Sequence, residues 1–181
     1  MFSCYLARHS DGHDKMQHLE GAIDAGRKAV AIAPGRPEGH FWLGADLGLM
    51  AEARGFLRGL TLVDSIRKEM EIVIRLDPEY EQAAGFRMLA RLDYRAPFFK
   101  GGDKRRSIEL LEQALDRYPD NSLTMLYLAD SLMALGRRDE ARQQLERILN
   151  LCPDPVYGPE QEENQEEARQ RLGKLRASTG R

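Results

Sequence analysis

Four prolines close similar apolar segments and divide the chain into units of similar length. They are Pro34, Pro78, Pro119 and Pro153, and the spacings between them are 44, 41 and 34 residues. Before each proline, apolar residues follow a helical spacing, which the proline ends because it lacks an amide hydrogen. Repeats of this length are typical of stacked helix pairs, in which neighbouring units bury one continuous core.

The residue composition favours helices over strands. The chain contains 24 Leu and 19 Ala, which are good helix formers, but only 7 Val and Thr together, which favour strands. Charged residues make up 31% of the sequence, as expected for many thin helices that each keep one face in water. We therefore expect an all-α fold with almost no sheet.

The last unit carries the most specific pattern. Counted from Ser122 as position 1, positions 4, 7, 8, 11, 15, 20, 24, 27 and 32 hold Met125, Leu128, Ala129, Leu132, Gly136, Ala141, Leu145, Ile148 and Pro153. These small and large residues match the contact positions of a tetratricopeptide helix pair, whose period is also about 34 residues. Gly136 is expected to end the first helix in a left-handed conformation. The pattern predicts a right-handed α-α superhelix.

The same reasoning divides a single domain, residues 1–181, into about three and a half tetratricopeptide units and a final helix. The predicted units are 1–34 (partial), 35–78, 79–119 and 120–153, followed by a capping helix at 159–176. The second unit exceeds the tetratricopeptide period, and we place its excess in a longer connection between its two helices. The first unit shows only its second helix clearly. The stretch at 2–8 is too short to cover that helix, so we expect the chain to continue upstream.

Five runs support a closer resemblance. They are HFWLG (40–44), GLTLVDSIRKEM (59–70), LDPEY (76–80), GFRMLARL (85–92) and GGDK (101–104). In this order they resemble the bacterial TatT-like tetratricopeptide proteins, the accessory T component found beside some TRAP transporters. They are more distantly similar to the regulator-of-microtubule-dynamics proteins. The resemblance covers about 19–175, and Asp93 departs from it, since the family usually carries an aromatic there.

The resemblance implies a function. Proteins of this kind are non-enzymatic, usually periplasmic and lipid-anchored, and associate with a solute-binding protein; they also hold small organic ligands. The present sequence begins without a signal peptide or lipoprotein signal, so its compartment stays open.

Binding is expected on the concave face, which the first helix of each unit lines. The candidate contacts are Phe41, Ala45, Gly48, Arg87, Arg91, Leu126, Asp130 and Met133. Arg87, Arg91 and Arg95 recur every four residues and form a guanidinium stripe on one helix face. Guanidinium groups bind carboxylates in a bidentate fashion, so a ligand with an acidic end and an apolar body would fit. The alternative is that Arg91 pairs with Asp130, or that all three arginines are solvated.

Other chemistry finds little support. His9, His13 and His18 offer ligands for zinc or nickel, but their polar, glycine-containing stretch is more typical of a solvated turn. Cys4 and Cys152 stand far apart without a CxxC motif, and no catalytic constellation is present. A net charge of −2 argues against a nucleic-acid partner, although local basic patches remain compatible with it. We expect no enzyme activity, no cofactor and no metal.

Two functions follow from the sequence. The first is a transport-associated scaffold that binds a partner protein, such as a periplasmic solute-binding protein, and a small hydrophobic carboxylate. The alternative is a generic tetratricopeptide adaptor for an acidic or helical peptide. Ile23, Val30 and Ile32 lie on a helix whose partner is incomplete, and their exposure would favour a homo-oligomer.

Overall fold

The computed structural model describes residues 12–179, with side chains from 15 to 176. Every regular element in that part of the chain is helical, which confirms the all-α prediction. The elements are α2 (Gly12–Ile32), α3 (Pro37–Ala53), α4 (Phe56–Gly59), α5 (Val63–Leu76), α6 (Tyr80–Arg95), η1 (Phe98–Lys100), α7 (Lys104–Arg117), α8 (Ser122–Ala134), α9 (Arg138–Leu149) and α10 (Gly158–Thr179).

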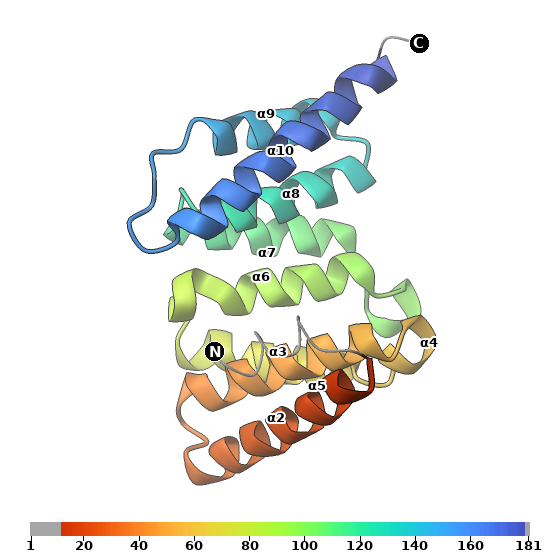
Figure 1. Ribbon diagram of the computed structural model, residues 1–181, viewed down its shortest axis with the longest axis vertical. Helices are drawn as coiled ribbons and strands as arrows, with labels where there is room; N and C mark the ends of the chain where they lie inside the picture. The colour runs from red at the N-terminus through yellow and green to blue at the C-terminus, as the bar shows by residue number, and fades with distance from the viewer. Residues whose placement is uncertain (1–11, 180–181) are drawn as a thin grey trace.

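The long helices stack one after another along the longest axis of the molecule (Figure 1). Each packs against the next: α2 on α3, α3 on α5, α5 on α6, and so on to α9 and α10. In addition α3 contacts α6, and α6 contacts α8. We call α3, α6 and α8 the inner helices, because they contact one another in turn and form one layer. We call α5, α7 and α9 the outer helices, which form the other layer.

Local signals mark where several helices begin and end. The Asp103 carboxylate accepts a hydrogen bond from the Arg105 amide at 2.8 Å and caps α7, and Asn121 caps α8 by accepting from the Thr124 amide at 2.9 Å. Gly136 has a φ of 75°, the left-handed conformation expected after the last inner helix.

The second unit contains a long connection between its two helices. Helix α3 ends at Ala53, and the short α4 is separate from it. Gly55 adopts a φ of 76°, a left-handed conformation that interrupts the helix. The connection between α3 and α5 is thus long, as expected, and contains one helical turn.

Two groups of buried side chains form most of the core. One joins α2, α3 and α5, with Leu19 and Met70 fully buried; the other joins α7 to α10, with Leu111 and Met125 fully buried. A Cβ added at Gly44 would meet the terminal methyl group of Met70 and would lie 3.2 Å from the Glu69 Cβ, so the missing side chain helps α3 and α5 to pack closely. Close packing of this kind fixes how neighbouring helices are placed.

One carboxylate joins three successive helices inside the stack. The Asp93 side chain on α6 is 0% exposed and forms an ion pair with Arg67 of α5, with 2.7 Å between Nη1 and Oδ1. Arg106 of α7 donates to the same carboxylate from Nε at 2.5 Å and from Nη2 at 2.6 Å. This pairing accounts for an acid at a position where the resembling family usually carries an aromatic.

The first helix is better covered than the sequence predicts. Ile23 is only 6% exposed and belongs to the same core group as Leu43, so the expectation that it lacks cover is wrong. Val30 is partly buried in that group, whereas Ile32 is 83% exposed. Within residues 12–179, no helix has the length and apolar character needed to cross a membrane.

Candidate binding surface

A pocket of about 720 Å³ opens where the inner helices and α10 begin. Its walls come from the first turns of α3, α6 and α8, from the α9–α10 connection and from the first turns of α10. The lining residues are Phe41, Trp42, Ala45, Glu81, Gln82, Ala84, Arg87, Asp120, Asn121, Ser122, Leu123, Asp154, Tyr157, Glu160, Gln161 and Glu163. A volume of this size can hold a small molecule or one or two side chains of a partner.

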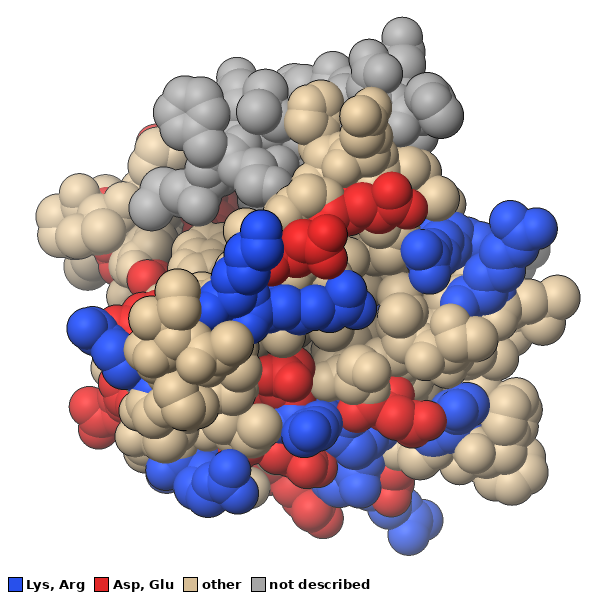
Figure 2. Space-filling view, turned by 90° about the horizontal axis from the view of Figure 1, so that it is seen from below, with Lys and Arg blue, Asp and Glu red and all other residues tan. Residues whose placement is uncertain are grey.

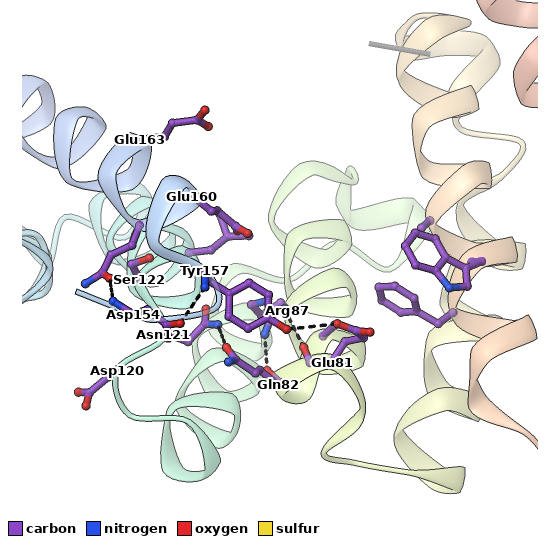
Figure 3. A pocket seen from close by; sticks show the side chains of 16 residues that line it. Glu81, Gln82, Arg87, Asp120, Asn121, Ser122, Asp154, Tyr157, Glu160 and Glu163 are labelled. Carbon is purple, nitrogen blue, oxygen red and sulfur yellow. Dashed lines mark hydrogen bonds between the residues drawn. The ribbon is translucent and has the colours of Figure 1, made fainter. Parts of the chain in front are cut away.

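Aromatic rings line two sides of the pocket. Phe41 meets Trp42 edge-to-face, with ring centroids 5.2 Å apart, and its ring centroid lies 5.3 Å from that of Tyr80. Across the pocket, the Tyr157 hydroxyl is directed toward Glu81, at 3.5 Å from Oε2 (Figure 3). Burial raises the pKa of Tyr157, and the negative charge of Glu81 raises it further.

The charge of the pocket is negative. Five carboxylates line it, against one guanidinium, that of Arg87. They belong to Glu81, Asp120, Asp154, Glu160 and Glu163. A concave surface with charges of one sign concentrates ligands of the opposite sign, so this pocket attracts cations.

The α9–α10 connection is held in place by its own polar side chains. The Asp154 carboxylate accepts from the amides of Val156 at 2.8 Å and Tyr157 at 2.7 Å. Gln161 accepts from the Asp154 amide at 2.6 Å and donates to the Cys152 carbonyl at 2.8 Å. These bonds fix the position from which Tyr157 reaches the pocket.

Arg87 lines the pocket, but its guanidinium has internal partners. It donates to the carbonyl oxygens of Gln82 and, at 3.1 Å, Glu81 (Figure 3). Burial lowers the pKa of Arg87, while the negative charge of Glu160 opposes this shift. Two of its donors are therefore already used before any ligand arrives.

The backbone that Arg87 holds is unusual. Glu81, Gln82 and Ala83, at the start of α6, have φ values of 48°, 54° and 60°. Each left-handed residue other than glycine costs about 1–2 kcal/mol, so three in succession persist only if their surroundings hold them. Arg87 supplies part of that hold, because it bonds to two carbonyls of this turn.

Arg91 pairs with Asp130, one of the alternatives left open by the sequence. Its Nη1 donates to the Asp130 carboxylate at 2.8 Å, which links α6 to α8. The guanidinium also lies 5.0 Å from the ring centre of Tyr94 and 4.7 Å from that of Tyr127. Arg171 of α10 donates to the second oxygen of Asp130 at 2.5 Å. This cluster lies outside the pocket lining.

The remaining sequence candidates divide into two sets. Phe41 and Ala45 line the pocket with Arg87. Gly48, Leu126 and Met133 do not; Leu126 is only 3% exposed and belongs to the core, while Met133 packs against that core from its edge. The Arg171 side chain donates to the Leu126 carbonyl at 3.3 Å, so α10 covers this part of the inner layer. Arg95, the last member of the stripe, pairs with Glu52 of α3.

Sequence reasoning missed the contribution of the α9–α10 connection. The pocket lining includes Asp154, Tyr157, Glu160 and Glu163, whereas the sequence indicated only a capping helix at 159–176. A signal was present in the spacing of the α10 residues that are buried. They recur every three or four positions: Gln161, Asn164, Ala168 and Leu172. That spacing indicates a helix that packs along one full face rather than one that only closes the end of a stack.

Metal-ligand geometry is missing from the described residues, where no group of three His, Cys, Asp or Glu is placed to hold an ion. His9 and the side chain of His13, which the sequence analysis considered, lie outside the described part. Cys152 is exposed and forms no disulfide.

Comparisons with known proteins identify the fold. Residues 99–157 match the sequence family described as Tetratricopeptide repeat. This chain has the tetratricopeptide-repeat fold. A comparison with curated protein sequences finds no match.

Solved structures agree over most of the tetratricopeptide chain. A crystal structure of MamA superposes with a TM-score of 0.58 at 17% identity, covering 94% of this chain and 95% of that one. A second structure, a crystal structure of MamA protein, superposes with a TM-score of 0.57 at 18% identity. It covers 91% of this chain and 85% of that one. At these identities the likeness shows the α-α superhelix alone.

Proposed function

We propose that this tetratricopeptide protein is a non-catalytic adaptor that binds a segment of a partner protein in the pocket at the start of its inner helices. The observation that carries the proposal is the pocket itself, which has walls from α3, α6 and α8, from the α9–α10 connection and from α10. A surface already formed by packed helices binds with little loss of conformational entropy. The tetratricopeptide fold supports protein binding as the kind of work involved.

The chemistry of the pocket favours a segment with a cationic side chain. A lysine or arginine entering it would meet the carboxylates of Glu81 and Glu160. Its alkyl chain and charge would lie beside Phe41 and Tyr157, which can contribute apolar contact and cation–π attraction.

This proposal differs from the acidic ligand expected from the sequence. That expectation needs free guanidinium groups, yet Arg91 pairs with Asp130 and Arg95 with Glu52. Arg87 is bonded to the backbone of its own helix. An acidic ligand would have to displace one of these partners and would also face the negative charge of the pocket.

The finer part of the proposal concerns the partner. The resemblance to TatT-like proteins supports a transport-associated role, in which a solute-binding protein supplies the segment that enters the pocket. Co-purification of the tagged full chain, followed by mass spectrometry of the retained proteins, tests that role separately from the chemistry of the pocket.

The ligand chemistry is tested by calorimetric titration with two peptides of about ten residues that alternate apolar residues with either Lys or Glu. We expect the Lys peptide to bind and the Glu peptide to bind at least about tenfold more weakly. Tighter binding of the Glu peptide would instead support the acidic-ligand alternative and refute the cationic one.

Paired variants locate the binding. Glu81→Gln with Glu160→Gln should weaken the Lys peptide about tenfold, because two carboxylates lose their charge. The control, Glu109→Gln with Glu146→Gln, removes two exposed charges from outer helices that do not line the pocket and should leave affinity unchanged. Equal effects of the two pairs would show that the peptide responds only to the net charge of the chain.

A further inference from the structure

Large apolar side chains stand in solvent on two connections between inner and outer helices. Phe56 and Leu57, between α3 and α5, are 67% and 80% exposed. Phe98 and Phe99, between α6 and α7, are 86% and 66% exposed. Soluble domains rarely gather so much exposed aromatic surface without a use for it.

The two connections lie on the same edge of the stack. Each leaves the C-terminal end of an inner helix, and Figure 1 shows α4 beside the segment that follows α6. The Lys100 amine lies 3.0 Å from the Asp64 carboxylate, which ties the second connection to the start of α5. Leu135, 40% exposed after α8, shares a hollow with Phe98. We call residues 54–62, 96–105 and 135–138 the connection edge.

The connection edge is basic. Its first two segments, 54–62 and 96–105, contain five Lys and Arg residues against one acid, Asp103. Among the described residues, Arg54, Arg58, Lys104 and Arg105 form no salt bridge, and all four are exposed. Aromatic and cationic groups therefore lie side by side along this edge, and these four cations, unlike Lys100, are available to an external anion.

The opposite edge has the reverse charge. The turns that lead into α6, α8 and α10 carry four acids, Asp77, Glu79, Asp120 and Asp154, whereas the turn that leads into α3 carries Arg36. At the end of the stack seen in Figure 2, by contrast, acidic and basic side chains are intermixed. The chain thus separates charge between its two long edges, although its net charge is only −2.

We propose that the connection edge binds the surface of an anionic lipid bilayer. Phenylalanines at the tips of connections can enter the boundary between headgroups and acyl chains without needing a matching pocket. Lysines and arginines beside them contact lipid phosphates, and each contributes to the attraction within a short screening distance. Charge complementarity on both edges favours this occupant, because the acidic edge is directed away from the anionic surface.

Such docking would fix the orientation of the stack. With the connection edge on the bilayer, the acidic turns and the pocket bounded by Asp120 and Asp154 face the aqueous side. The pocket would then remain open to a partner while the chain is on the membrane. The variants that test this inference change no residue that lines the pocket, so its outcome is independent of the proposed function.

The test is co-sedimentation of the full chain with vesicles of phosphatidylcholine, with and without about 30% phosphatidylglycerol. We expect binding to the anionic vesicles, weakened by salt. Phe98→Ser with Phe99→Ser, and separately Arg54→Glu with Arg58→Glu, should each reduce it about tenfold or more.

Matched controls use the opposite edge and the body of the stack. Ile32→Ser with Val156→Ser removes side chains that are 83% and 73% exposed but lie off the connection edge. Lys28→Glu with Lys68→Glu reverses two exposed charges elsewhere. Controls that retain more binding than the edge variants support the proposal.

Three results would overturn the proposal. The full chain does not bind anionic vesicles, or the edge and control variants lose vesicle binding equally. In the third, the edge variants keep vesicle binding and lose only the binding of a protein partner. Circular dichroism of each variant confirms that the helices are intact, so that loss of binding is not loss of fold. Peptide titration with the same variants separates this test from that of the pocket.

Discussion

The carboxylate of Asp93 provides the sharpest test of how the stack is held together. Asp93→Asn keeps the size of the side chain but removes a charge that is 0% exposed and bonded to Arg67 and Arg106. Removal of one partner from a buried ion pair typically destabilises by about 3–5 kcal/mol, because the other charge is left without compensation.

The structure narrows this range. The Arg106 side chain is 44% exposed, so water can solvate its guanidinium and partly compensate for the lost ion pair with Asp93. Arg67 is only 17% exposed, but it keeps a hydrogen bond to the Gly101 carbonyl at 3.1 Å. We therefore expect a loss near the lower limit, about 3 kcal/mol, which corresponds to about 6–12 °C in melting temperature.

Urea unfolding followed by circular dichroism measures this loss. Asp130→Asn is the matched control, since Asp130 also lies between two arginines but is 22% exposed; we expect about 1 kcal/mol there. A triple change, Asp93→Leu with Arg67→Met and Arg106→Met, should recover most of the stability because no buried charge remains. If Asp93→Asn lowers the free energy of unfolding by less than about 0.5 kcal/mol, or by as much as Asp130→Asn does, the buried carboxylate does not hold the stack together.

Three further predictions concern local structure. Arg87→Met should lower the free energy of unfolding by about 2 kcal/mol and speed amide hydrogen exchange at 81–84, because two carbonyls of the left-handed turn lose their donor. Unchanged exchange at these residues would show that Arg87 does not hold the turn. Backbone amides of Arg106 and Arg105 lower the pKa of Asp103, so its cap stabilises α7 above the usual aspartate pKa and is lost as pH falls through the lowered value. The difference in melting temperature between wild type and Asp103→Ala should therefore shrink toward about pH 3, and a difference that grows would be the wrong sign. Gly102→Ala should be strongly destabilising because its methyl group would overlap the Ala96 carbonyl, whereas Gly21→Ala, with open space around it, should stabilise by about 1 kcal/mol in thermal unfolding.

The sequence predicted the fold well because its signals are local and repeated. Prolines, small contact residues and cap residues such as Asp103 and Gly136 act within one or two turns, so each can be interpreted without knowledge of distant contacts. Agreement among several units then indicated how the helix pairs stack.

The candidate site was harder to predict because it depends on contacts between distant residues. Arg91 is bonded to Asp130, 39 positions away, and α10 covers part of the inner layer through Arg171. The left-handed turn at Glu81 contains no glycine, so nothing in its sequence marks it. The sequence shows three arginines spaced four residues apart, but it does not show the carboxylates and carbonyl groups that bind them.

Peptide mapping by NMR shows whether a cationic segment binds in the pocket at the start of the inner helices. Isotope-labelled full chain is titrated with the Lys peptide, and the backbone amide resonances are followed residue by residue. We expect the largest shifts on the pocket walls, around Phe41, Arg87 and Tyr157. Shifts confined to the outer helices α5, α7 and α9, or none at a saturating peptide concentration, would contradict binding in the pocket.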